Sequence, residues 1–182
     1  MKPFLIATLS WFLALPALAG VDINAFKTDG GLTVWHVEDH SIPFVALELR
    51  FRGGASLDAE GKRGATNLMT GLIEEGAGDM TALEFQTRRQ ELAASFSFRA
   101  NDDLMSISAE FLTENRDEAM ALLREALVNP RFDADAIERV RAQVLSGIAS
   151  DAKRPNRIAG AAFDAAAFPN HPYGNSMDGT AE

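Results

Sequence analysis

Residues 45–54 read VALELRFRGG and contain the clearest strand signal in this chain. Apolar side chains occupy every second position from Val45 to Phe51, and the glycine pair Gly53–Gly54 ends the pattern. A period of two with one apolar face is typical of a half-buried β-strand. The apolar face predicts that other elements pack against this strand.

The remaining patterns predict a second strand pair and several helices. Residues 63–75 carry an apolar stripe at helical spacing, and Thr81 with Glu84 has the spacing of a capping box, which opens a helix through about Ala93. Residues 95–111 alternate on both sides of an Asn-Asp-Asp turn, as in a β-hairpin. Further elements are expected as a short strand over 32–37 and helices over 115–128, 133–153 and 158–167, with Pro130 and Pro155 as breaks. This order predicts an α+β fold, an antiparallel or mixed sheet with helices packed on one face.

The composition narrows the classes of function. The chain has 26 acidic and 17 basic residues and no cluster of lysine and arginine along the sequence, so nucleic acid is not an expected partner. It has no cysteine, so its stability cannot depend on disulfides. A hydrophobic content of 47% fits a globular domain with an ordinary core.

The first nineteen residues have the layout of a secretory signal peptide. Lys2 gives a positive start, residues 4–15 are almost all apolar, and Ala17 and Ala19 are small residues at the two positions that a signal peptidase reads. We therefore expect cleavage after Ala19 and a mature chain that begins at Gly20. A membrane anchor is the alternative, but the run is shorter than the roughly 20 apolar residues that span a bilayer. No later segment is apolar enough to span.

Several short motifs follow one another between residues 24 and 182. They are FRGGASLD at 51–58, the predicted helix between Gly64 and Gly76, NPRF at 129–132, IERVR at 137–141, HPYG at 171–174 and the pair Gly179–Thr180. No single motif is specific, but their order and spacing resemble the first domain of the pitrilysin/insulinase family, an M16-like family of zinc peptidases. The resemblance implies one such domain over residues 20–182. We also expect the chain to be part of a longer protein, with a second, homologous domain beyond it.

The resemblance also locates the positions that bind zinc in active members. Those members carry His-x-x-Glu-His on the first helix, in which two histidines on one helical face ligate Zn²⁺ and the glutamate acts as general base. The histidine positions correspond here to Asn67 and Gly71, the base position to Thr70, and the two glutamate positions of the long helix to Val140 and Gly147, the second of which is the distal zinc ligand. None of these five residues can replace a zinc ligand or a base. We therefore expect no metal, no cofactor and no catalytic residue on this chain, and no activity of the chain alone.

Other residues do not rescue the site. Glu74 and Glu75 lie nearly a turn further along the predicted helix, and no histidine accompanies them. His36 and His40 are four residues apart but fall on a strand and its turn, and His171 belongs to a loop motif. Two glycines inside helices are unusual, since each costs about 1 kcal/mol relative to alanine. Close packing of another element against the vacated site would explain both.

The resemblance implies a working unit of two similar halves that enclose a chamber for unfolded peptides. In two-chain forms one subunit commonly keeps the zinc site and the other does not. This chain fits the second role, as the non-catalytic subunit of a periplasmic heterodimer with zinc on its catalytic M16-like partner. By position, the strand that would hold peptide includes Phe96, Ser97 and Phe98. The alternatives are a stand-alone peptide-binding or scaffold protein and a hydrolase with an unrecognised site, although the chain has no Gly-x-Ser-x-Gly motif.

Overall fold

The computed structural model describes residues 21–181, so the expected signal peptide and its cleavage site lie outside the described residues. The chain divides into two compact units, with the boundary between Ile42 and Pro43. In the first unit, β1 (Asn24–Lys27) and β2 (Thr33–His36) form an antiparallel hairpin. The sequence patterns did not predict β1, because its four residues are all exposed and show no alternation of buried and exposed positions.

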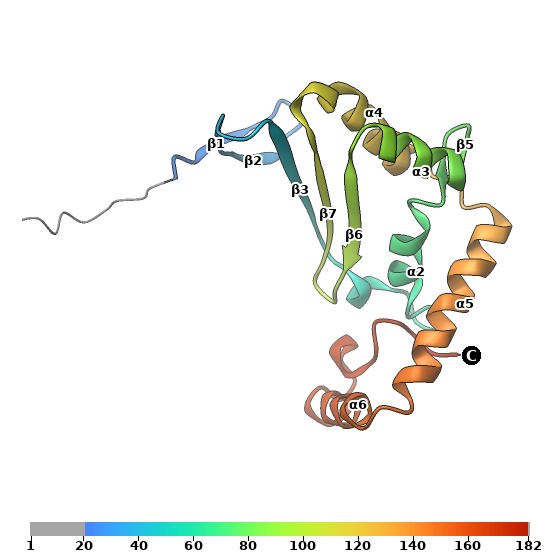
Figure 1. The fold of residues 1–182 in the computed structure, drawn as a ribbon. Helices are drawn as coiled ribbons and strands as arrows, with labels where there is room; N and C mark the ends of the chain where they lie inside the picture. Colours follow the sequence, from blue (N-terminus) through green and yellow to red (C-terminus); the bar gives the residue numbers. More distant parts are fainter. Residues whose placement is uncertain (1–20, 182) are drawn as a thin grey trace, which may run out of the picture. The chain divides into compact units, whose positions relative to one another are not determined.

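The second unit contains a three-stranded antiparallel sheet in the order β3-β7-β6 (Figure 1). These strands are β3 (Phe44–Arg52), β6 (Ser95–Ala100) and β7 (Leu104–Leu112). Leu49 and Phe98 both pair with Ile107 in the middle strand, so the apolar residues of all three strands share one face. The edges of this sheet are β3 and β6.

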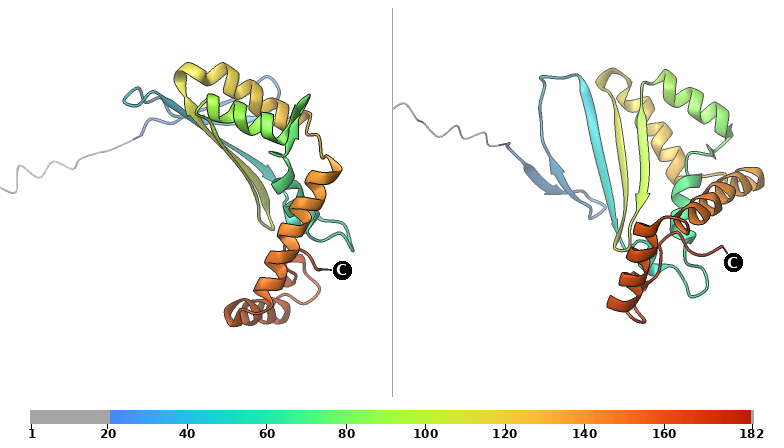
Figure 2. Two further views of the ribbon diagram at one scale, coloured as in Figure 1. Left: turned by 45° about the vertical axis from the view of Figure 1, so that its right-hand side comes forward. Right: turned by 60° about the horizontal axis from the view of Figure 1, so that its bottom comes forward.

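Two helices cover the apolar face of the sheet, and Figure 2 shows both on the same side. They are α3 (Ala82–Glu91) and α4 (Arg116–Val128). Phe85 of α3, Ile107 of β7 and Leu123 of α4 are each less than 2% exposed and form the centre of the core. Thr81 and Glu84 make the capping box that the sequence predicts at the start of α3.

Three further helices belong to the second unit. They are α2 (Ala65–Leu72), α5 (Ala134–Asp151) and α6 (Pro155–Ala167), with 3-10 turns at Ala55–Leu57, Thr113–Asn115 and Pro172–Gly174. Leu72 of α2 packs with Ala136 and Val140 of α5 in a second, smaller core cluster. None of the helices within residues 21–181 is long and apolar enough to cross a membrane.

The predicted α+β class is confirmed, and the differences are local. The first helix of this unit ends at Leu72, earlier than expected, and a small hairpin of β4 (Gly76–Ala77) and β5 (Met80–Thr81) follows. Gly76 and Gly78 both have positive φ, which favours glycine and turns the chain there. Strands of two residues are too short for an alternating pattern. Pro155 does not merely interrupt the long helix, because it occupies the first turn of α6, where a missing N–H costs nothing.

Candidate functional site

The start of α2 is held by a carboxylate from the loop that follows β3. Asp58 accepts hydrogen bonds from the N–H of Gly64 (2.8 Å) and of Thr66 (3.1 Å), and from the Thr66 hydroxyl (2.6 Å). These amides belong to the first turn of the helix and have no partner within it. The FRGGASLD motif therefore ends in the residue that caps the helix on which a zinc motif would lie.

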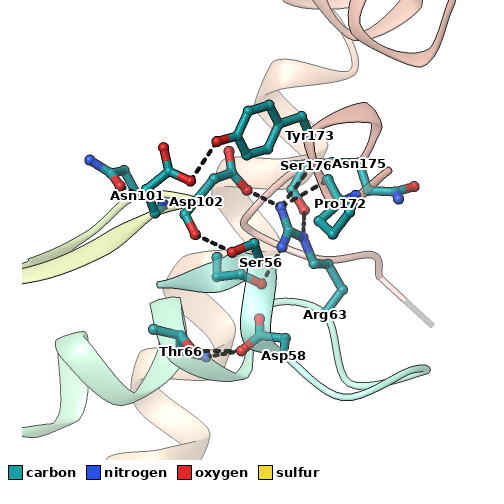
Figure 3. Close-up of polar contacts among 12 residues, drawn as sticks. Ser56, Asp58, Arg63, Thr66, Asn101, Asp102, Pro172, Tyr173, Asn175 and Ser176 are labelled. Atoms are coloured by element: carbon teal, nitrogen blue, oxygen red, sulfur yellow. Dashed lines mark hydrogen bonds and ion pairs between the residues drawn. The ribbon is translucent and has the colours of Figure 1, made fainter. Parts of the chain in front are cut away.

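Arg63, directly before α2, joins the sheet to the C-terminal part of the described chain (Figure 3). Its guanidinium donates to the carbonyl of Ala55 and lies 2.5 Å from a carboxylate oxygen of Asp102 in the β6–β7 turn. The same guanidinium donates to three further carbonyls, those of Pro172, Asn175 and Ser176. The side chain is only 18% exposed, so it links three segments around the start of α2.

The polar side chains at the expected zinc positions of α2 are bonded within the protein. Asn67, at the first histidine position, donates from Nδ2 to Oδ1 of Asp178 over 2.9 Å. Thr70, at the base position, is 8% exposed and donates from its hydroxyl to the Asn67 carbonyl over 2.8 Å. Both donors are therefore used within the protein.

Val140 lies against the second histidine position. A Cβ atom added to Gly71 would lie 3.0 Å from Cγ1 of Val140, which is tighter than most real contacts. Close packing therefore explains this glycine, as predicted. It does not explain Gly147, where an added Cβ would meet no atom within 4 Å. The structure thus brings Gly71 of α2 and Val140 of α5 together, and it leaves open space at Gly147.

These residues do not fit a zinc ion. Zinc in catalytic sites is bound by three imidazole, carboxylate or thiolate ligands, and the five positions carry none. Across residues 21–181, no group of three or more His, Cys, Asp or Glu side chains is arranged to hold a metal ion.

The two glutamates after α2 are engaged in ion pairs. Glu74 lies 2.6 Å from Arg89, and Glu75 lies 2.5 Å from Arg139 of α5. Burial raises the pKa of Glu74, and the charge of Arg89 opposes that rise. Both carboxylates thus hold neighbouring helices together.

None of the three histidines belongs to α2 or α5. His36 and His40 belong to the first unit, and His40 contacts Glu38 at 2.9 Å. His171 accepts a hydrogen bond at Nδ1 from the Tyr173 amide and so caps the short turn that follows it.

Strand β6, which contains Phe96, Ser97 and Phe98, is an edge strand of its sheet and contacts α2. The Asn101 amide donates to the carbonyl of Leu104, its partner in register. Hydrogen-bonded pairs alternate in an antiparallel ladder, so Ser97 pairs with β7 while the backbone groups of Phe96 and Phe98 face the open edge. The structure thus separates the three predicted peptide-binding residues into one inward and two outward positions.

Three residues of this region were not found from the sequence. Asp58, Arg63 and Asp178 carry charges that hold α2 in place, but each acts on residues that are distant along the chain or separated by a loop. The only signal was the acidic end of the FRGGASLD motif, which does not reveal which amides it caps.

An α+β domain with a short first helix packed on a long helix, and with no imidazole, carboxylate or thiolate at the five predicted zinc positions, fits a metallopeptidase fold without its metal site. The chain belongs to the insulinase family, peptidase family M16, whose model matches residues 33–181. The family resemblance drawn from the motifs is thereby confirmed.

Relatives of known sequence or structure agree with a non-catalytic member. A protein of Helicobacter pylori described as "Non-peptidase homolog YmxG" is 31% identical over all of this chain and 42% of its own length. The crystal structure of a peptidase M16 inactive domain from Pseudomonas fluorescens is 26% identical, with a TM-score of 0.84, over 88% of this chain and 39% of that one. A protease structure from Helicobacter pylori, 16% identical with a TM-score of 0.75 over 88% of this chain and 39% of its own, shows the fold alone. The chain spans about two fifths of the length of these proteins.

Proposed function

We propose that this chain is the non-catalytic subunit of an exported zinc peptidase of the M16 family, which encloses and binds unfolded peptides for a catalytic partner that carries the zinc. The observation that carries the proposal is the helix pair α2–α5. Its family zinc positions hold Asn67, Thr70, Gly71, Val140 and Gly147, on a fold otherwise kept intact. The similarity to a non-peptidase homologue and to an inactive domain supports it.

The peptide would bind by adding a strand to β6. Within residues 21–181, β6 pairs only with β7, so the outward N–H and C=O groups of Phe96, Phe98 and Ala100 have no strand partner on the side where the peptide would add. Main-chain hydrogen bonds of this kind give affinity without demanding one sequence, as a chamber for unfolded peptides requires.

The partner is tested by purifying the full-length protein from its native periplasm and identifying the proteins that accompany it by mass spectrometry. We expect a second M16 protein with an intact His-x-x-Glu-His motif, present in equal amount and containing the zinc. The isolated subunit should contain less than one equivalent of zinc and cleave no unfolded peptide. Purification as a single species that still binds peptide would instead favour the stand-alone scaffold.

Two proline substitutions test the binding edge. One removes an N–H group that points to the open edge, and the other removes an N–H group that bonds to β7. Ala100→Pro removes an outward N–H and is tolerated at a sheet edge, so it should weaken peptide binding while the thermal melt stays close to that of the parent. Ser97→Pro removes a bond of the ladder to β7 and should lower the melting temperature. Ala100→Val is the control, because it keeps the N–H. Unchanged binding in a folded Ala100→Pro protein would rule out the β6 edge.

A further inference from the structure

One end of the sheet face opposite α3 and α4 is positively charged. This end of the face carries Arg50 and Arg52 of β3, Ser106 and Ser108 of β7, and Ser97 and Arg99 of β6, and the same face also carries Glu48 and Glu110. Arg50 and Arg99 both pair in register with Ser106, so they lie in one row across the sheet. All three arginines are exposed. Such a positive surface is unusual in a chain with a formal net charge of −9.

Two carboxylates share this face, and within the described residues only Glu48 forms an ion pair with one of the three arginines; Glu110 lies further along β7, in register with Ser95. Glu48 pairs with Arg50 at 3.2 Å and accepts a hydrogen bond from the Ser108 hydroxyl over 2.5 Å. The Ser108 hydrogen bond, followed by Arg50 and Arg99, lowers the pKa of Glu48. In the part of the chain that the structure describes, neither Arg52 nor Arg99 belongs to an ion pair.

Arg99 differs from the other two arginines because it lies on the edge strand. Its backbone pairs with β7, while its neighbours Phe98 and Ala100 direct their N–H and C=O groups to the open edge. A strand added there would lie roughly 5 Å from β6, and its residue opposite Arg99 would point to the same face. Arg50 is two strands further away, at roughly 15 Å from the added strand, beyond the Debye length of about 8 Å at physiological salt.

The other face of an added strand would meet different chemistry. Alternate residues of the peptide would lie on the side of Phe96 and Phe98, which belong to or pack against the apolar core. An apolar residue fits there, and a charged residue would be partly removed from water. The two faces of β6 therefore favour an acidic and an apolar side chain at successive positions of the peptide.

We propose that Arg99 is a specificity-determining residue that selects extended peptides in which apolar residues alternate with an acidic one. This inference rests on the proposed function, because it assumes that β6 receives a peptide strand. The guanidinium of Arg99 would donate two parallel hydrogen bonds to an Asp or Glu carboxylate and repel a lysine at the same position.

The test uses the full-length protein and three labelled peptides that differ at one position. Each peptide alternates valine with serine, and its central serine is replaced by Glu, Gln or Lys. Fluorescence anisotropy at low salt measures the three dissociation constants. We expect the Glu peptide to bind about fivefold tighter than the Gln peptide, and the Lys peptide to bind most weakly, in line with a single exposed charge pair. High salt should remove the difference.

Two variants with the same change of charge locate the effect. Arg99→Gln should make the Glu and Gln peptides bind equally, whereas Arg50→Gln, in the same row but two strands away, should change their ratio less than about twofold. Arg99→Glu should reverse the order and favour the Lys peptide. Equal binding of all three peptides to the parent would overturn the inference and leave peptide binding intact. Equal effects of Arg50→Gln and Arg99→Gln would also overturn the inference. Failure of every peptide to bind would overturn the proposed function as well.

Discussion

Gly71 and Val140 touch so closely that a Cβ atom on Gly71 would lie 3.0 Å from Cγ1 of Val140. Gly147, on the same helix as Val140, has no atom within 4 Å of the corresponding position. The two glycines at the predicted zinc positions thus differ in the space beside them. A side chain on Gly71 would meet Val140 of the small core cluster, whereas nothing obstructs a side chain on Gly147.

This difference predicts opposite effects of alanine. Gly147→Ala should stabilise the protein by about 0.5–1 kcal/mol, because alanine is the better helix former and nothing obstructs it. Gly71→Ala should give no gain or a loss, because its methyl group meets Val140. Adding Val140→Ala should recover the gain, with a coupling of about 1 kcal/mol in a double-mutant cycle. Thermal melts of the parent, of each single variant and of the double variant measure these effects. Equal gains from both glycines would contradict the packing argument.

A zinc site should return when its ligands do. We expect zinc binding, measured by elemental analysis after dialysis, in a variant that combines Asn67→His, Thr70→Glu, Gly71→His and Gly147→Glu. Val140→Ala is included to make room for the new histidine. Zinc sites contribute on the order of 10 kcal/mol, so even imperfect geometry should give measurable affinity. Turnover is a separate demand, because the groups that orient the ligands are missing too.

The control for that variant shifts the histidines by one residue. Thr66→His with Thr70→His keeps the spacing of four but points to a different side of α2, and Thr66 is already bonded to Asp58. The shifted set should bind zinc far more weakly. Equal binding by both sets would show that the assignment of positions along α2 is wrong.

Removing the Arg63 side chain should destabilise the second unit strongly. Arg63→Met leaves the Asp102 carboxylate and four carbonyls without their donor, and we expect a loss of about 2–4 kcal/mol in urea unfolding. Arg63→Lys should recover little, since an ammonium cannot reproduce the planar fork. Arg116→Met is the control, because Arg116 pairs with Asp117 on the exposed surface, where water screens the pair, and its removal should leave the urea midpoint nearly unchanged.

Tyr173 is the single tyrosine of the chain, so its ionisation can be followed alone. Its hydroxyl donates to Asp103 over 2.5 Å, and this hydrogen bond, followed by burial and the charges of Asp103 and Asp102, raises its pKa. The tyrosinate absorption band should therefore appear above the ordinary midpoint of about 10. Asp103→Asn should bring the midpoint back toward that value.

The raised pKa of Tyr173 also determines the direction in which stability changes with pH. A pKa raised by folding means that the native state holds the proton more firmly. The contribution of Tyr173 is thus fully present below the unfolded pKa and is lost as pH rises through the folded value. Tyr173→Phe should flatten this alkaline part of the stability curve. An unchanged curve would mean that the contact with Asp103 does not form in solution.

The sequence predicts this fold well where a single element has a regular hydrophobic period or a capping motif. The alternation appears as predicted from Val45 to Leu49, although Phe51 is exposed at the end of the strand, and the Thr81–Glu84 cap forms as predicted. It fails where an element is too short to show a period, as in β1, or where a contact joins distant residues, as between Asn67 and Asp178. The family resemblance predicts the vacated zinc positions, but only packing distinguishes the two glycines among them.

The contacts that hold the start of α2 set an order of assembly during synthesis. The sheet with α3 and α4 draws only on residues 44–128, so its core can form as soon as those residues are available. Arg63 must wait for acceptors up to 113 residues later in the chain, at Ser176, and Asn67 must wait for Asp178. Closing so long a loop is slow compared with local pairing. A nascent chain halted before Pro172 would therefore carry a finished sheet and a first helix held only by Asp58, α5 and the earlier partners of Arg63, and the last contacts at its start would close only when the rest of the chain emerges.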